Sequence, residues 1–348
     1  MIKRNILDCM TLVGGTPSHF EGEKTYVSTG AVDCDHVDYA QTERVTYDNR
    51  PSRANLSVAE GDILFAKMCG TKKTLRIDRQ LSEHLYSTGF CAVRANESLM
   101  DAALLYHLLA SDQFLTQKDQ NSSGATQKAI TNAGLRKIVI RVPDLSEQRK
   151  LAANLDCIEQ MMAKRREQLV SFDQLVKSRF IELFGDPIDN TMCLKTMPLG
   201  EACFLKAGIT TAADAIHEQS AVYPVPCYGG NGIRGYVKEA TQHGCYPIIG
   251  RQGALCGNVQ MATGEFHATE HAVLVTPLIE TNVVWLFHLL RMMDLYRFHT
   301  GAAQPGLAVK TLNTVDIPIA EIAVQNNFAS FVEQTDKSKL CGKMEVAA

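Results

Sequence analysis

The fold is decided by a stretch of sequence that occurs twice, GATQKAITNAGLRKIVIRVPDLSEQRKLA at residues 124–152 and GAAQPGLAVKTLNTVDIPIAEIAVQNNFA at residues 301–329. The copies align without a gap, which pairs Gly124 with Gly301, Gln127 with Gln304 and Gln148 with Gln325. Upstream, LLYHLL (104–109) is matched by WLFHLL (285–290). Solenoid repeats are only about 20–50 residues long, whereas these two copies begin much further apart in the chain, at Gly124 and Gly301. The repeat therefore indicates a duplicated domain.

Composition agrees with a globular chain of two domains, since 348 residues exceed the usual size of one. The eleven cysteines are scattered and never spaced Cys-x-x-Cys, which argues against a disulfide framework and against a zinc site. The N-terminal segment has no apolar signal core, and no apolar run is long enough for a membrane span. We therefore expect a cytoplasmic protein that does not enter a membrane.

Charge alone does not indicate a nucleic-acid partner, because the net charge is −3 and the isoelectric point is about 6.4. Local groups of cations are nevertheless present. Lys72, Lys73, Arg76 and Arg79 lie close together in the sequence, and Lys128, Arg136, Lys137 and Arg141 form a looser group. Such groups are either solvated surface or patches that bind anions.

A long helix is expected between the two copies, because apolar residues recur there in steps that are mostly four and three. These residues are Leu151, Leu155, Ile158, Met162, Leu169, Phe172, Val176 and Leu183. The pattern is typical of a coiled coil about 50 Å long, with Ser146 as its predicted N-cap and Gly185 as its end. The alternative is a long surface helix packed on one domain.

The same apolar pattern begins again after the second copy, at Phe328, Val332, Thr335 and Lys339. It then stops, because the chain continues as CGKMEVAA from residue 341. The sequence therefore predicts a second coiled-coil helix over 323–348 that is truncated relative to the first.

Both lobes have the pattern of mixed α/β domains. Strands are expected within AEGDILFAK (59–67) and GCYPIIGR (244–251), and helical stretches at 101–117 and 281–296, where His107 and His288 are expected to be core or rim residues. The sequence contains no P-loop, zinc-protease, nucleophile-elbow or dinucleotide motif. We expect no catalytic residue and no metal ligand, and YGGNGIRG (228–235) is interpreted as a tight turn.

Five phrases carry a family resemblance. They are YPVPCYGGNGIRGYV (223–237), YPIIGRQGALCGNV (246–259), TEHAVLVTP (269–277), RFIELFGDP (179–187) and FVEQTDKSKL (331–340). Set in the repeat order derived above, they make the chain resemble the specificity subunit of type I restriction-modification systems over nearly its whole length. The first lobe resembles that family more loosely, through GGTPS (14–18) and GDILFAK (61–67).

The resemblance implies an α/β fold of two duplicated target-recognition domains joined by long coiled-coil helices. The first domain would cover residues 1–145, the spacer helix 146–186, the second domain 187–322 and the truncated helix 323–348. Each domain would read one half of a bipartite site in double-stranded DNA, and the helices would set the gap between the halves.

The resemblance also implies a non-catalytic subunit, without a cofactor or metal of its own. In the family, two methyltransferase subunits bind S-adenosylmethionine and methylate adenine at N6 after flipping it out of the duplex. Restriction subunits, which use ATP and Mg²⁺, make the complex an endonuclease.

Candidate DNA contacts follow from side-chain chemistry, since Arg and Lys pair with guanine and Asn and Gln pair with adenine. In the first lobe we select Lys67, Lys72, Lys73, Arg76, Gln127 and Lys128. In the second lobe we select Tyr228, Asn231, Arg234, Arg251, Gln252 and Gln304.

The short second helix leaves three interpretations open: a functional subunit with a shortened spacer, a fragment completed by another polypeptide, or a non-functional or decoy remnant. A different class of protein is also compatible with the acidic net charge, namely an interaction module that binds proteins and not DNA. The salt dependence of DNA affinity distinguishes the two classes, because phosphate contacts release counterions.

Overall fold

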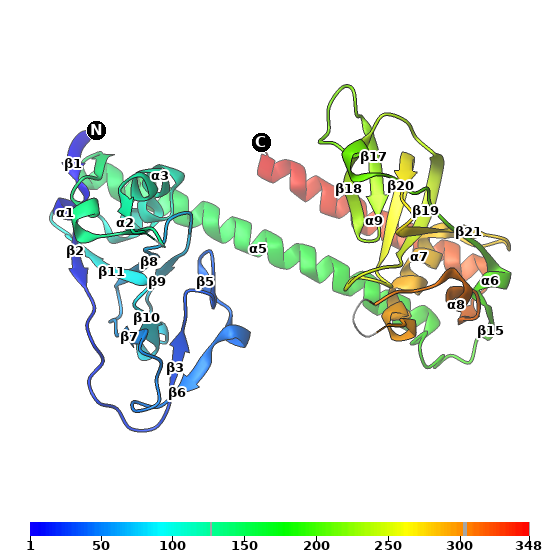
Figure 1. Cartoon of the computed structure of the whole chain (residues 1–348), viewed down its shortest axis with the longest axis horizontal. Coiled ribbons are helices and arrows are strands. Elements are labelled where there is room, and N and C mark those ends of the chain that lie inside the picture. Colours follow the sequence, from blue (N-terminus) through cyan, green and yellow to red (C-terminus); the bar gives the residue numbers. More distant parts are fainter. Residues whose placement is uncertain (126, 302–304, 348) are drawn as a thin grey trace. The chain divides into compact units, whose positions relative to one another are not determined.

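A computed structural model describes residues 1–125, 127–301 and 305–347, with the side chains of the C-terminal helix described as far as Lys339. It divides into two compact units, Met1–Ala163 and Lys164–Ala348, which we call unit 1 and unit 2 (Figure 1). Helix α5 (Leu145–Phe184) contributes residues to both and has 40 residues, equivalent to about 60 Å. The predicted mixed α/β fold, with its duplication and its long helix, is confirmed.

Unit 1 is built on two four-stranded sheets. One has the strand order β2–β11–β8–β9, from Met10–Val13, Phe90–Ala95, Ile63–Ala66 and Thr74–Arg76. The other has the order β6–β3–β10–β7, from Glu43–Val45, Lys24–Val27, Leu85–Ser87 and Ala54–Leu56. Strand β8 is buried throughout because Ile63 and Phe65 face one core while Leu64 and Ala66 face the other.

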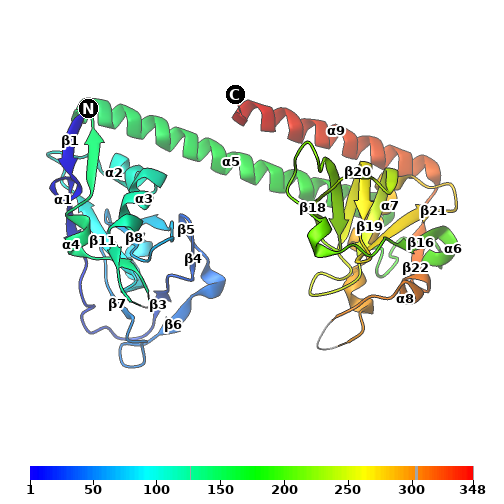
Figure 2. The same cartoon turned by 45° about the horizontal axis from the view of Figure 1, so that its top comes forward.

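Unit 2 is built on one six-stranded sheet of order β16–β21–β19–β20–β17–β18. Its strands are Cys203–Ala207, Ala272–Pro277, Gln242–Gly250, Val259–Ala268, Val225–Gly229 and Gly232–Val237. Helix α7 (Val283–Met292) lies against this sheet and buries Trp285, Leu286 and Leu289 in the same core as Ile249 (Figure 2). The strand predicted at 244–251 is therefore present as most of β19.

A two-stranded antiparallel sheet occurs at the same place in each repeat. Strand β1 (Ile2–Asn5) pairs with β14 (Val139–Val142), and β15 (Lys195–Pro198) pairs with β22 (Asp316–Ile319). The remaining short helices and strands are α1 (Ile6–Cys9), α4 (Asn132–Leu135), α6 (Leu199–Ala202), α8 (Val309–Asn313), β4 (Val32–Asp33), β5 (His36–Val37), β12 (Ser122–Ser123) and β13 (Ala129–Ile130).

The helical stretch expected over 101–117 is two helices, α2 (Ala102–Leu109) and α3 (Asp112–Gln120). The chain breaks between them because the hydroxyl of Ser111 donates to Leu108 O and accepts a hydrogen bond from Phe114 N, which caps α3. In unit 2, α7 ends at Met292, and Asp294 adopts a left-handed conformation with φ of 46°. The expected helix over 281–296 was therefore too long.

The repeated glutamine fastens each long helix to its own unit. Gln148 is buried, and its amide accepts a hydrogen bond from Asp101 N at 2.9 Å and donates to Leu99 O and Pro143 O. Gln325, also buried, accepts from Asn282 N at 2.9 Å and donates to Ala320 O. Asp101 and Asn282 are the N-caps of α2 and α7, so both repeats contain the same joint.

We predict that Gln148→Ala lowers the free energy of unfolding by about 2–4 kcal/mol, because it leaves several buried backbone groups without partners. Chemical denaturation of the purified chain measures this change. Gln174→Ala, at an exposed position of the same helix, is the matched control and should change stability little. Equal effects of the two substitutions would contradict the assigned role of Gln148.

The ends of α5 agree only partly with expectation. Asp144, and not Ser146, caps the helix, because its carboxylate accepts a hydrogen bond from Glu147 N at 3.0 Å and the helix begins one residue before Ser146. Gly185 follows the last helical residue with φ of 74°, a conformation that favours glycine.

Helix α9 (Ile322–Ala347) lies antiparallel to the C-terminal half of α5 (Figures 1 and 2). The ring centroids of Phe180 and Phe328 are 5.4 Å apart, and further along the pair Lys339 Nζ lies 2.8 Å from an Asp173 carboxylate oxygen. Val176 is buried here, while the predicted Leu169, Phe172 and Leu183 are partly buried.

The N-terminal half of the predicted α5 pattern is exposed. Four residues remain between 38% and 53% accessible, namely Leu151, Leu155, Ile158 and Met162. In the described part of the chain, the helix pair therefore buries the C-terminal half of the predicted α5 pattern and leaves these four positions uncovered.

Candidate nucleic-acid interface

One backbone arrangement, which we call the strand-end site, follows the buried central strand of unit 1. Beyond β8, the backbone of 67–69 bonds to that of 128–130. Ile130 N donates to Lys67 O at 2.9 Å, and Cys69 N donates to Lys128 O at 2.9 Å. Lys67 thereby lies opposite Ile130 and Lys128 opposite Cys69, so the two lysines lie diagonally across the paired backbone.

The strand-end site occurs again in unit 2, beyond β19. Leu307 N donates to Arg251 O at 2.8 Å, and Gly253 N donates to Pro305 O at 2.9 Å. The bridge partners Ala129 and Gly306 occupy matching positions of the sequence repeat. Lys67 and Arg251 are consequently equivalent, and each unit presents a cation at the end of a core strand.

The paired glycines of the repeat share a backbone conformation that favours glycine. Gly124 and Gly301 both have positive φ, 144° and 89°. A Cβ on Gly124 would lie 2.2 Å from Gln127 O, so a larger residue could not close this turn.

The two strand-end sites differ in their side chains. In unit 1, Lys67 is half-buried, and Gln127 and Lys128 are exposed. In unit 2, Gln252 is exposed, and Arg251 is half-buried with an Nε atom that finds no hydrogen-bond partner among the described residues. Gln304 lies outside the described residues. The sites bring together three predicted DNA contacts in unit 1 and two in unit 2.

A buried lysine that the sequence analysis missed supports the unit 1 site. Lys118 is 1% exposed, and its ammonium donates to Met68 O at 2.6 Å and Thr71 O at 3.2 Å. The neighbouring Asp119 accepts a hydrogen bond from Gly70 N at 3.0 Å. A lysine among polar residues of a short helix gives no sequence signal of burial, so only the structure shows this contact.

We predict that Lys118→Met releases the 68–71 turn, because two carbonyl groups lose their donor and Asp119 loses its counter-ion, the Lys118 ammonium 3.2 Å from Asp119 Oδ1. Amide exchange of residues 68–73 should accelerate roughly 10- to 100-fold, corresponding to about 1–3 kcal/mol of local stability. Hydrogen-exchange mass spectrometry measures this change. Lys137→Met, at an exposed lysine of the same unit, is the control, and unchanged exchange in the Lys118 variant would contradict the assignment.

The other predicted lysines of unit 1 lie near this turn and contact protein groups. Lys72 pairs with Asp112 at 2.7 Å, and Lys73 Nζ donates to Thr29 O at 2.8 Å. Exposed ion pairs such as that of Lys72 are weak, so exchange for a phosphate would cost little. Their contact with DNA stays a prediction.

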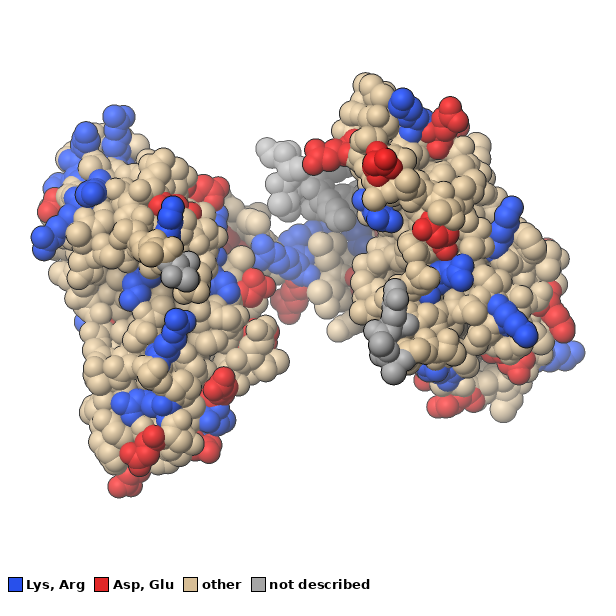
Figure 3. Space-filling model, viewed as in Figure 1, with Lys and Arg blue, Asp and Glu red and all other residues tan. Residues whose placement is uncertain are grey.

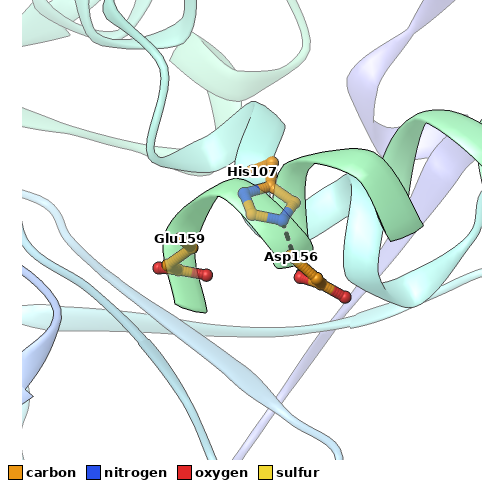
Figure 4. A group of neighbouring side chains, drawn as sticks. All are labelled: His107, Asp156 and Glu159. Atoms are coloured by element: carbon orange, nitrogen blue, oxygen red, sulfur yellow. Dashed lines mark hydrogen bonds and ion pairs between the residues drawn. The ribbon is translucent and has the colours of Figure 1, made fainter. Parts of the chain in front are cut away.

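Arg76 is held against α5 by several groups. Its guanidinium bonds to Asp156, lies 3.9 Å from a Glu159 oxygen and stacks 4.1 Å from the centroid of the Tyr106 ring. His107 Nε2 lies 2.8 Å from Asp156 Oδ1, as Figure 4 shows. The structure therefore gives Arg76 an intramolecular role against the N-terminal half of the long helix, and its DNA contact stays a prediction.

The same network includes three residues whose side chains lie close enough together to be considered as metal ligands. His107, Asp156 and Glu159 place one ligand atom each within 4.8 Å of one another (Figure 4). The hydrogen bond from Arg76 holds the pKa of Asp156 below its usual value, to which His107 adds. Because the guanidinium already supplies the positive charge, these residues form an ion-pair network and we assign no metal to them.

In unit 2, the predicted turn at 228–235 joins β17 to β18. Asn231 and Arg234 are exposed, and the Asn231 side chain accepts a hydrogen bond from Asn258 Nδ2. Tyr228 is 9% exposed, and its ring packs on Phe266 with centroids 5.5 Å apart. The Tyr228 ring therefore belongs to the core, while Asn231 and Arg234 are accessible to a ligand.

His288 is part of the packing between α7 and α9, as expected for a core residue. Its ring lies 5.3 Å from that of Phe328, and burial lowers its pKa to about 4. It is therefore neutral at physiological pH. No helix in the described part of the chain is long and apolar enough to cross a lipid bilayer.

Two α/β units that carry equivalent strand-end cations, and two long helices that run antiparallel, define a duplicated α/β protein with paired helices. The chain belongs to the family of the type I restriction modification DNA specificity domain (Methylase_S), whose model matches residues 19–170 and 194–342. The family assignment made from the sequence phrases is thereby confirmed.

Two bacterial relatives agree with this assignment. The chain is 32% identical over 277 residues to the type I restriction enzyme EcoprrI specificity subunit of Escherichia coli, a match covering 73% of this chain and 66% of that protein. It is 29% identical over 112 residues to a putative type I restriction enzyme specificity subunit, S.HindORF215P, of Haemophilus influenzae, covering 31% of this chain and 29% of that protein. The chain thus spans less than two thirds of the length of either relative.

Solved structures have the same fold. The S subunit of a type I restriction-modification system from M. genitalium superposes with a TM-score of 0.62 at 16% identity, covering 99% of this chain and 92% of the other. A chain from a study of complex assembly and conformational transition of the type I system gives a TM-score of 0.52 at 19% identity, with coverage of 99% and 92%.

Proposed function

We propose that this chain is the DNA-reading specificity subunit of a type I restriction-modification complex. Each unit reads one half of a bipartite target, and the helices set the distance between the halves. The observation that carries the proposal is the strand-end site, because one scaffold presents Lys67 in one unit and Arg251 in the other at equivalent positions. Different side chains on one scaffold are what two different half-sites require.

The chain itself is proposed to be non-catalytic and to act in the cytoplasm. The chemistry would belong to two methyltransferase subunits, which bind S-adenosylmethionine, and to restriction subunits, which use ATP and Mg²⁺. The paired helices α5 and α9 are proposed as the docking surface for the methyltransferase subunits. Support comes from the exposed apolar residues of α5, among them Leu151 and Ile158.

The test is to express the chain with a methyltransferase subunit of the same system and to map N6-methyladenine across the host DNA by single-molecule sequencing. We expect methylation at a bipartite motif with a fixed gap. If the complex forms and methylates nothing, the chain is a decoy or an incomplete subunit. If the chain binds other proteins and shows no salt-dependent affinity for DNA, it is an interaction module.

A further inference from the structure

A group of cations covers the end of unit 1 where β1, β14 and the start of α5 meet, as Figure 3 shows at the upper left. We call these residues the basic patch: Lys3, Arg4, Arg136, Lys137, Arg141, Arg149 and Lys150. All are exposed except Arg4, which is half-buried. None belongs to the candidate DNA contacts discussed above.

The strand register places cations of the patch next to one another. Lys3 lies directly opposite Arg141 in the β1–β14 pair, so their side chains leave the same face. Arg136 adjoins the end of β1, because its carbonyl oxygen accepts a hydrogen bond from Asn5 Nδ2 at 2.6 Å. Arg149 and Lys150 follow β14 on the first turns of α5.

The patch is not neutralised by the protein. Across the described residues, none of its members forms an ion pair. Acidic residues of the same segments are few, and Asp144 uses its carboxylate to cap α5. Since like charges directly opposite in a sheet are destabilising, Lys3 and Arg141 weaken the isolated unit unless an anion lies between them.

Unit 2 shows that the scaffold does not need these charges. Thr196 and Pro318 occupy the places of Lys3 and Arg141 in the equivalent β15–β22 pair. The repeat replaces the other exposed members by neutral residues, which are Asn313, Thr314, Asn326 and Asn327. The charge is therefore a property added to unit 1 and not a requirement of the fold.

The patch lies close to the strand-end site of the same unit. Helix α4 (Asn132–Leu135) is the only element between Ile130 and Arg136, and at 1.5 Å per residue its four residues span about 6 Å. Cations therefore extend from Lys128 through Arg136 and Lys137 to the β1–β14 pair. A duplex contacting the strand-end site has phosphates within reach of the patch.

We propose that the basic patch binds the phosphate backbone of DNA next to the half-site read by unit 1, independently of base sequence. This inference rests on the proposed function. DNA is favoured over an acidic protein because a duplex at the strand-end site of the same unit already brings phosphates within reach of the patch. Unit 1 thereby anchors the subunit more firmly than unit 2 does.

The experiment compares two triple variants in the full chain bound to its methyltransferase subunits. The test variant is Lys3→Gln, Arg141→Gln and Lys150→Gln. The control, Lys195→Gln, Lys206→Gln and Lys310→Gln, removes three exposed positive charges from unit 2. Affinity for a duplex carrying the mapped motif is measured by fluorescence anisotropy between 50 and 200 mM salt.

We expect the slope of log affinity against log salt to fall by about 2–3 in the test variant, since each lost phosphate contact removes about 0.9. The control should keep the wild-type slope, and both variants should methylate the wild-type motif. An unchanged slope in the test variant overturns the proposal, as does loss of bound methyltransferase subunit, which would identify the patch as a protein contact. A wild-type complex without a bipartite motif would instead refute the proposed function.

Discussion

Lys67→Ala is expected to relax recognition in one half of the DNA motif and leave the other half intact, while Arg251→Ala should do the reverse. Each cation sits at the strand-end site of its own unit, on backbone fixed by hydrogen bonds of 2.8–2.9 Å to the neighbouring segment. A cation that contacts a base contributes about 1–3 kcal/mol of discrimination, so affinity for the intact site should fall roughly 5- to 150-fold.

The measurement combines methylation mapping with binding to duplexes in which one half-site at a time is altered. For the Lys67 variant, altering the corresponding half-site should cost little further affinity, whereas altering the other half should cost as much as in the wild type. Lys206→Ala, at an exposed lysine of unit 2, is the control. A loss spread evenly over both halves would show that the two residues contact phosphates only.

Arg251→Lys refines this prediction, because a guanidinium can bond to guanine through two parallel hydrogen bonds and an ammonium cannot. If Arg251 reads a base, this substitution should weaken recognition almost as much as alanine. If it contacts a phosphate, lysine should restore most of the affinity and the salt dependence.

The repeat was predictable from sequence because it is fixed by residues whose roles do not vary with the ligand. Gln148 and Gln325 are buried, and each both accepts from and donates to backbone groups at its helix joint, which a side-chain amide of this length can do. Gly124 and Gly301 both have positive φ, which favours glycine. Because both units need the same backbone hydrogen bonds and the same backbone conformation at these positions, they have the same residues there.

The site was predicted less completely, since sequence spacing shows neither which charges are already paired nor which side chains point inward. Arg76 looked like a free cation, yet it bonds to Asp156, which lies 80 residues away in the sequence. Lys118 looked like an ordinary surface lysine and is buried against the backbone of a turn. Tyr228 was selected as a candidate DNA contact, and its ring lies in the core.

The helix pair was predicted from apolar residues that recur in steps of four and three. This pattern located the contact between the helices but missed two of its most buried residues. Phe180 and Phe184 are 0% and 3% exposed, although neither was selected. Phe180 lies between Val176 and Leu183, and Phe184 directly follows Leu183, where the packing of α5 in unit 2 needs a wider apolar stripe than a two-in-seven pattern provides.

Phe328→Ala should therefore destabilise unit 2 by about 3–5 kcal/mol, the usual cost of removing a fully buried aromatic side chain. The Phe328 ring lies 5.4 Å from Phe180 and 5.7 Å from Phe184, and all three belong to one core with Trp285. The cavity left by this substitution would lie where α5, α7 and α9 meet. The substitution should therefore weaken the attachment of α9 as well as the stability of unit 2.

Calorimetry of the purified chain and cleavage by a protease within 322–339 measure the two effects. Phe204→Ala, at a residue that is 54% exposed on β16, is the control and should cost less than about 1 kcal/mol. If α9 helps to set the distance between the two half-sites, the Phe328 variant should also methylate motifs with a variable gap before it loses its preference for either half-site sequence. A variant that unfolds with the stability of the control would show that α9 is not integral to the core of unit 2.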